Sequence, residues 1–224
     1  MSETERGGQS SEAFAFLRQF MRRRDLAETC EMCALPLADA HQHLLEPATR
    51  KLACACDACA ILFSSQSSNH QRTPRYKRVP RRVRALDDFQ LTDGQWDSLM
   101  MPINMAFFFE STPQSRVIAL YPSPAGATES LLPLDAWEDI AAENPALRQM
   151  ESDVEALLVN RLGHARGFSN PEYYVVPIDE CFKLVGLIRG HWRGLSGGTE
   201  VWQQMGQFFA DLKKKAGVFG ERHA

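Results

Sequence analysis

Residues 30–59 read CEMCALPLADAHQHLLEPATRKLACACDAC and contain five of the six cysteines in the chain. Cys30 with Cys33, and Cys56 with Cys59, form two C-x2-C pairs separated by 22 residues. Each such turn directs two sulfurs at one point, and a hairpin between the pairs would place the second turn opposite the first. Four thiolates then close a tetrahedral shell and leave no coordination position open for chemistry. The pattern predicts a structural metal site made of Cys30, Cys33, Cys56 and Cys59.

The residues between the two pairs follow the pattern of a β-hairpin. Residues 41–45 are typical of one strand, Glu46–Arg50 of a turn, and residues 51–55 of the returning strand. This is the connection that a zinc ribbon needs between its two cysteine turns.

Three further possible ligands lie in the hairpin. By the two-residue period of a strand, Cys54 shares a face with Cys56 and could sit beside the metal or replace a ligand. A spare buried thiol is the preferred interpretation. His41 and His43 also share a face, and either could be a ligand, although a histidine beside the site or at the surface is preferred.

The identity of the metal is open between zinc and iron, since both bind in tetrahedral four-sulfur sites. Rubredoxin-like iron turns usually carry glycine after the second cysteine, whereas this chain has Ala34 and Ala60 there. The close C-x2-C-x2-C run of ferredoxins is also missing. The sequence therefore favours zinc, with a rubredoxin-like iron–thiolate redox protein as an alternative.

Bulk composition is ordinary for a soluble globular protein, with 44% hydrophobic and 24% charged residues. No apolar run approaches the roughly 18 residues that span a membrane. The first residues show no basic stretch followed by an apolar core, so no secretory signal is expected. We expect a cytoplasmic protein, because thiols stay reduced there and bind metals.

Charge divides the chain near residue 84. The part before this point carries 14 Lys and Arg against 9 Asp and Glu, and the part after it carries 11 against 19. Residues 11–24 show helical spacing of apolar side chains and are expected to cover the metal module. The predicted organisation is a disordered tail over 1–10, a helix and zinc-ribbon module over 11–63, a polar and basic linker over 64–84, and an α+β domain over 85–224.

The last of these parts is predicted to be a mixed α+β domain with an antiparallel sheet. Its apolar runs predict strands over 103–110, 116–121, 131–132, 153–160 and 173–176. Residues 153–160 also fit a helix, and a strand is the preferred interpretation. Helices are expected after the caps Thr92 and Asp179, and over 133–142 and 200–215. The proline-rich segment 122–128 is expected to be a fixed loop, and 162–171 a glycine-rich one.

Cys181 is a candidate nucleophile, because it follows the expected cap Asp179 and a helix N-terminus lowers a thiol pKa. His191 lies about 15 Å along the same helix, too far to act as its base. His164 could serve instead, but a buried structural cysteine is the preferred interpretation. With no recognisable catalytic motif, the sequence favours a non-catalytic binding or assembly protein.

Residues 72–84, RTPRYKRVPRRVR, carry seven basic side chains. A basic, tyrosine-containing arm beside a zinc ribbon is typical of nucleic-acid binding. A basic arm could equally dock on the acidic half of the same chain. A nucleic-acid-binding zinc-ribbon regulator is therefore an alternative function, and no membrane partner is expected.

Several stretches together resemble an uncharacterised bacterial family, a domain of unknown function, that is associated with NiFe-hydrogenase gene clusters. They cover most of residues 29–212: CEMC, HQHLL, CACDACAILF, RYKRVP, AFFF, ALYPSPAGATES, DVEALLV, YYVVPIDECFKLVGLIR and HWRGLSGG. The resemblance implies no activity. It implies an accessory, assembly or chaperone role near a NiFe hydrogenase, with a hydrogenase subunit or maturation factor as the protein client.

Overall fold

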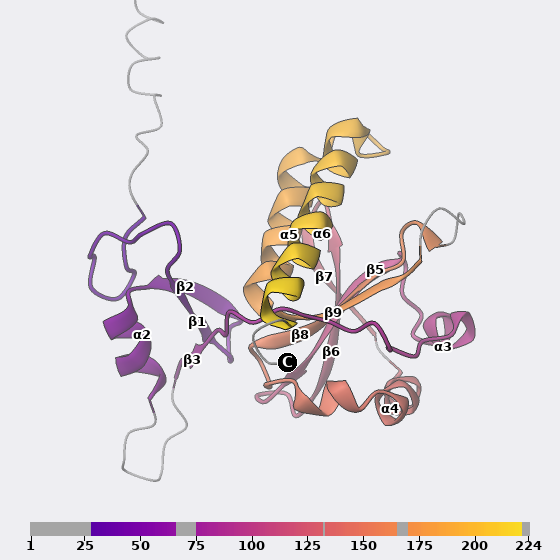
Figure 1. Cartoon of the computed structure of the whole chain (residues 1–224), viewed down its shortest axis with the longest axis horizontal. Helices are drawn as coiled ribbons and strands as arrows, with labels where there is room; N and C mark the ends of the chain where they lie inside the picture. The colour runs from indigo at the N-terminus through magenta and orange to yellow at the C-terminus, as the bar shows by residue number, and fades with distance from the viewer. Residues whose placement is uncertain (1–27, 66–74, 132, 165–169, 221–224) are drawn as a thin grey trace, which may run out of the picture.

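The structure is a computed structural model that describes residues 28–65, 75–131, 133–164 and 170–220 (Figure 1). The expected tail over 1–10 and helix over 11–24 lie outside these ranges. In the part described, a three-stranded sheet precedes a six-stranded sheet, and all strand pairs are antiparallel. This confirms the predicted α+β class, with a cysteine-rich hairpin before a larger sheet domain.

The small sheet carries the cysteine module, at the left of Figure 1. Its hairpin joins β1 (Gln42–Glu46) to β2 (Lys51–Ala55), and helix α2 (Asp57–Ser64) follows. The predicted strands and turn are thus confirmed. Strand β3 (Lys77–Arg78), from the basic segment, pairs with the other side of β1. We call β1, β2, β3 and α2, with residues 28–41 before them, the ribbon.

The large sheet has the order β4-β9-β8-β5-β6-β7. Its strands are β4 (Arg84–Ala85), β5 (Met105–Ser111), β6 (Arg116–Ser123), β7 (Gly126–Ser130), β8 (Glu155–Asn160) and β9 (Glu172–Pro177). The two most continuously apolar strands, β5 and β8, lie in the middle, as expected for strands covered on both faces.

Helices cover both faces of this sheet (Figure 1). On one face lie α5 (Ile178–His191) and α6 (Gly198–Gly220). On the other lie α3 (Asp93–Ser98), α4 (Leu134–Glu143) and the 3-10 helix η1 (Pro145–Gln149). Thr92 caps α3 by a reciprocal capping box with Gln95, which confirms the predicted cap.

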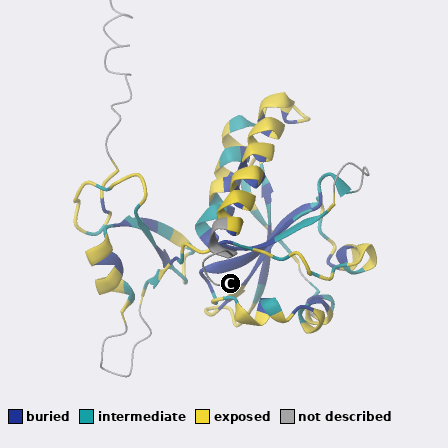
Figure 2. Ribbon diagram, in the orientation of Figure 1, coloured by how far each residue is buried: buried dark blue, intermediate teal, exposed yellow. Residues whose placement is uncertain are grey.

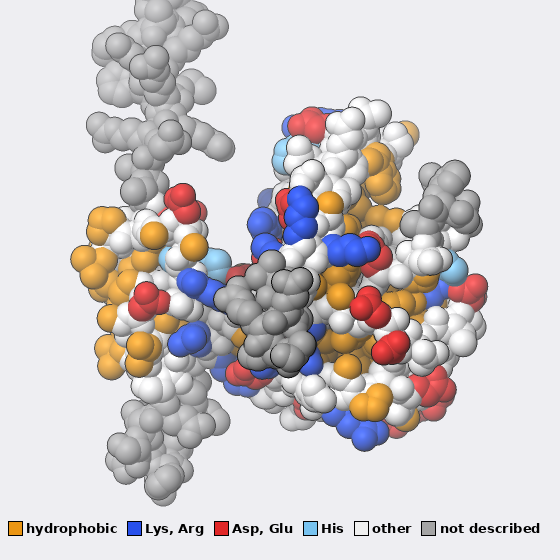
Figure 3. Space-filling model, in the orientation of Figure 1, with side chains coloured by type: hydrophobic (Ala, Val, Ile, Leu, Met, Phe, Trp, Pro, Cys, Tyr) orange, Lys and Arg blue, Asp and Glu red, His pale blue; other side chains and the backbone are white. Residues whose placement is uncertain are grey.

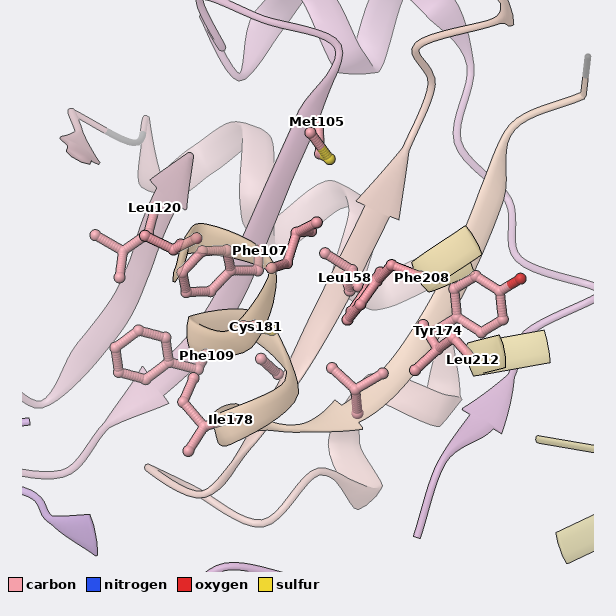
Figure 4. Packing of buried hydrophobic residues seen from close by; sticks show 14 of the residues in the cluster. Met105, Phe107, Phe109, Leu120, Leu158, Tyr174, Ile178, Cys181, Phe208 and Leu212 are labelled. Atoms are coloured by element: carbon pink, nitrogen blue, oxygen red, sulfur yellow. The ribbon is translucent and has the colours of Figure 1, made fainter. Parts of the chain in front are cut away.

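The alternation of side chains along β5 explains why both faces need a cover. Phe107 and Phe109 belong to the core beneath α5 and α6, as Figure 4 shows. Phe108 points to the other face and stacks on Trp137 of α4, with ring centroids 5.1 Å apart. The resulting dark-blue centre of Figure 2 lies along the sheet, with exposed residues on the outer sides of the helices.

Two predictions about loops and strands in this domain are wrong. Segment 122–128 is not a loop, because β6 continues through Pro122 and a tight turn leads into β7. Beyond Leu120, β6 pairs only with β7, so a residue without an N–H is tolerated in the ladder. The short strand expected over 131–132 is found earlier in the chain, since β7 ends at Ser130 and residue 132 lies outside the described ranges.

Asp179 is not the cap of α5. The helix begins at Ile178 after Pro177, and no side chain caps it. A carboxylate oxygen of Asp179 instead lies 2.6 Å from Nδ1 of His43, within hydrogen-bond distance.

The ribbon packs against the larger domain. Leu45 of β1 and Leu52 of β2 join the core beneath α5 and α6. Lys77 pairs with Asp153 at 2.8 Å, and the basic segment then enters the large sheet as β4. The described part of the expected linker thus contributes a strand to each sheet.

Candidate metal centre

The four cysteines of the two C-x2-C pairs converge at one end of the ribbon. Their sulfurs all lie within 4.8 Å of one another, and the six cysteines of the chain are all free thiols. Cys33 Sγ and Cys56 Sγ are 3.8 Å apart. Bonds of about 2.3 Å in a tetrahedron place two sulfurs roughly 3.8 Å apart, so this spacing suits a four-thiolate site. The cluster can hold a metal ion and fits a zinc-ribbon-like module.

Two local structures orient these thiols toward one another. The turn after Cys30 closes with the Ala34 N–H donating to the Cys30 carbonyl at 2.7 Å, and Ala34 has a φ of 62°. Glycine is usual at this place because it enters the left-handed region without strain. On the other side, Cys56 begins α2 and Cys59 lies in its first turn. Ala60, within that helix, needs no glycine.

Without a metal, the four thiols do not ionise together. Burial raises the pKa of Cys30, but the N–H groups of Cys56, Met32 and Cys33 outweigh it and lower that pKa to about 6. Burial and the neighbouring sulfurs raise the pKa of Cys59 to about 12. One thiolate is therefore favoured near neutral pH, and only a bound cation can offset the repulsion among four.

The ribbon has little other core around these thiols. Among the residues that the structure describes, the buried side chains that cluster with Cys30 and Cys59 are Leu44, Ala55 and Ala60. Leu44 is the one large aliphatic side chain among them, so a metal would supply much of the cohesion of this part.

The other sulfur and imidazole ligands weighed from the sequence form a separate group. Cys54 does not join the four thiols, because β2 ends at Ala55 and the strand period does not reach Cys56. It gathers instead with His41 and His43, one ligand atom of each lying within 4.8 Å of the others. The half-buried Cys54 is therefore not a fully buried spare thiol.

Asp179, which contacts His43, is the residue near this second group that sequence reasoning missed. It is 136 positions further along the chain, and no spacing rule relates the two. The pairing of His43 with Cys54 could have been found, because the turn between β1 and β2 fixes their register.

Cys181 is not assembled into a catalytic group. It is fully buried in the core, and burial raises its pKa well above the ordinary value. His164 Nε2 lies 3.0 Å from Asp93 rather than near Cys181, and His191 Nδ1 donates to the Leu187 carbonyl.

Several cations of the basic arm meet carboxylates of the same chain. Arg75 lies 2.6 Å from Glu46 of the ribbon. Arg82 forms two hydrogen bonds to Glu155, a carboxylate that is completely buried in the larger domain. Burial alone would raise the pKa of Glu155, but Arg82 holds it below its usual value.

Apolar side chains gather on the outer surface of the ribbon (Figure 3). Ile61, Leu62 and Phe63 of α2 are 60%, 68% and 39% exposed, and Leu35 of the first cysteine turn is 57% exposed. We call these four residues the ribbon patch. Among the residues that the structure describes, no helix is both long and apolar enough to cross a membrane.

The fold and the cysteine cluster define an α+β protein with a zinc-ribbon-like module at its N-terminal side, whose four cysteines can hold a metal ion. The family of unknown function DUF5947 matches residues 29–216, and the chain belongs to that family. No curated protein and no solved structure matches the chain significantly.

Proposed function

We propose that this protein is a non-catalytic, zinc-binding accessory or assembly protein of the cytoplasm that acts by binding a protein client. The client we propose is a NiFe-hydrogenase subunit or maturation factor. The observation that carries the binding role is the ribbon patch, which presents large apolar side chains to solvent beside the four-cysteine site.

The closed character of the site supports a structural role for the metal. Four cysteine ligands fill a tetrahedral zinc shell, whereas catalytic zinc keeps one position for water or substrate. Zinc is favoured over iron because both residues after the cysteine turns are alanine. Reduced thiols at all six cysteines suit the cytoplasm.

The ribbon patch supports protein binding on general grounds. Apolar side chains clustered at a surface mark interaction sites more often than scattered ones do. Leu62 is exposed on α2, whereas Cys59 and Ala60 of the same helix are buried in the ribbon. A metal bound by the ribbon would thus hold α2 and its exposed apolar side chains in place for a partner.

The hydrogenase part of the proposal has its support in the resemblance of sequence stretches described above. Two alternatives remain from the sequence, a nucleic-acid-binding regulator and an iron–thiolate redox protein. The first is less favoured because Lys77 and Arg82, two cations of the arm, pair with Asp153 and Glu155 of the same chain.

Co-purification from the native host tests the proposal. Tagged full-length protein should recover a hydrogenase subunit or maturation factor, identified by mass spectrometry. Leu62→Asp should reduce that recovery at least tenfold. Leu195→Asp is the matched control, because Leu195 is equally apolar and fully exposed but lies in the α5–α6 turn.

Three outcomes would contradict the proposal. The first is equal recovery with both variants, and the second is recovery of no hydrogenase protein. The third is a lower melting temperature for purified Leu62→Asp, since Leu62 would then pack inside the folded chain and not be free for a client. Sub-micromolar, steeply salt-dependent binding of DNA or RNA by the purified protein would favour the nucleic-acid alternative instead.

A further inference from the structure

The second group of ligands lies on the face of the hairpin opposite the four thiols. Leu44 packs beside Cys30 and Cys59, whereas its neighbours His43 and Leu45 face the larger domain. Cys54 stands directly opposite His43 in the antiparallel register and therefore shares that face. His41, two residues before His43, lies beside it with the ring centroids 4.9 Å apart.

Hydrogen bonds orient both imidazole rings. His41 Nδ1 lies 2.9 Å from the Ala38 carbonyl oxygen, and His43 Nδ1 lies 2.6 Å from the carboxylate of Asp179. A carbonyl oxygen only accepts, so Nδ1 of His41 carries the hydrogen and Nε2 of the neutral ring holds a lone pair. In metal sites the non-ligating ring nitrogen of histidine makes this kind of bond to a carbonyl or carboxylate.

One of these nitrogens lacks a partner in a place where water does not reach it. The side chain of His41 is 8% exposed, and its Nε2 is buried with no hydrogen-bond partner among the described residues. Leaving a buried nitrogen without a partner is destabilising, so an additional ligand is expected there.

We infer that His41, His43 and Cys54 form a second transition-metal site, with three protein ligands and a fourth position for an exchangeable one. The ligand set of two imidazoles and one thiolate suits zinc or another borderline divalent ion of the first transition series. Ligand atoms of a tetrahedral site lie roughly 3.4–3.8 Å apart, so closure from a group within 4.8 Å shortens no separation by more than about 1.4 Å.

The place of this site distinguishes it from the four-cysteine centre. Asp179 belongs to the first turn of α5, so its bond to His43 joins the ribbon to the larger domain. An ion held by His43 would strengthen that junction. With three ligands rather than four, it should also be the more easily exchanged of the two ions.

Cobalt(II) is a suitable probe, because a cobalt–thiolate bond absorbs in the near ultraviolet. Full-length protein is first washed with chelator, and its remaining zinc is measured. We expect one zinc to remain and one further equivalent of cobalt to bind with thiolate absorption, without release of zinc. His41→Ala and Cys54→Ser should abolish the cobalt signal but keep the zinc. Asp179→Asn should weaken cobalt binding about 10–100-fold.

Two control variants distinguish the loss of this site from general effects of a substitution on cobalt binding. Cys181→Ala removes a cysteine outside both groups and Asp135→Asn an exposed carboxylate of α4, so neither should change cobalt binding. Circular dichroism checks that each variant is folded. Absence of a cobalt–thiolate signal, or an equal signal in Cys54→Ser, would overturn the inference and show at most adventitious binding. Loss of the chelator-resistant zinc alone would contradict the four-cysteine centre instead.

Discussion

The ribbon and the six-stranded domain bury very different amounts of apolar surface. The ribbon encloses its four thiols with small side chains and Leu44, whereas the domain buries large side chains on both faces of its sheet. Each large side chain contributes about 1.5–3 kcal/mol on burial, against an ordering cost of about 1–2 kcal/mol per residue. The comparison teaches that the domain can fold on hydrophobic burial, whereas the described part of the ribbon would need a bound metal for much of its stability.

The largest effect should follow from removing one thiol of the four-cysteine centre. Zinc binding in such modules is worth about 10–16 kcal/mol at neutral pH, so Cys56→Ser should unfold the ribbon. Residues 85–224 should remain folded, with some loss from the contacts of Leu45 and Leu52. Limited proteolysis should give a resistant C-terminal fragment. Cys181→Ala, the control, should stay intact, and global unfolding of Cys56→Ser would show that both parts share one core.

The converse experiment removes a large side chain from the domain. Phe107 is fully buried beneath α5, and Phe107→Ala should cost about 3–5 kcal/mol of unfolding free energy through the cavity it leaves. Urea unfolding followed by tryptophan fluorescence measures the loss. The variant should still retain its chelator-resistant zinc under native conditions. Loss of zinc in parallel with the sheet would contradict the independence of the ribbon.

A smaller effect concerns the arm that joins the two parts. Arg82→Ala leaves Glu155 buried without its cation, which should cost about 3 kcal/mol at pH 7. Arg116→Ala is the control, because its partner Glu129 is partly exposed and such pairs contribute about 0–1 kcal/mol. Urea unfolding at pH 7 gives both values, and equal losses would contradict a special role for the bond between Arg82 and the buried Glu155.

The Arg82–Glu155 pair also predicts that the free energy of unfolding depends on pH. Arg82 lowers the pKa of Glu155 in the folded protein, from an ordinary value of 4.5. The stabilisation is therefore complete above pH 4.5 and is lost as pH falls through the lower folded value. The difference in unfolding free energy between the wild type and Arg82→Ala should shrink in that range. A difference that stays constant under acid would contradict this assignment.

The smallest expected effect is an increase in how strongly the ribbon retains its metal. Ala34 adopts a left-handed backbone conformation in the first cysteine turn, with φ of 62°. Ala34→Gly removes about 1 kcal/mol of strain, so the ribbon should hold its metal against chelator several-fold better. Ala60→Gly is the control, because Ala60 is helical and glycine there should cost about 1 kcal/mol. If both substitutions changed metal retention equally, backbone strain at Ala34 would not be the cause.

The sequence predicts the parts of this molecule that depend on local spacing. The cysteine turns, the hairpin and the apolar strand β5 follow from periods of two residues and from C-x2-C geometry. Strand β7 was missed because its pattern is weak at the sheet edge and a proline-rich segment precedes it. A loop and an edge strand with prolines look alike in sequence.

The second ligand group could not be predicted for a different reason. The sequence shows His43 and Cys54, but it relates them only to the first site, as replacement ligands, as a histidine beside the site or at the surface, or as a spare thiol. Their separation from it depends on which face of the hairpin meets the larger domain, and this is a tertiary contact. Asp179 was assigned to a helix cap because acidic residues favour helix starts, but its bond to His43 forms across 136 residues.

X-ray absorption spectroscopy on chelator-washed, full-length protein, together with elemental analysis, tests the central claim most directly. We expect one zinc per chain with four sulfur neighbours at about 2.3 Å and no nitrogen or oxygen in the first shell. Stoichiometric iron in a red or brown protein would contradict the zinc assignment. A zinc shell containing nitrogen would show that the four thiols do not form the structural centre on which the ribbon depends.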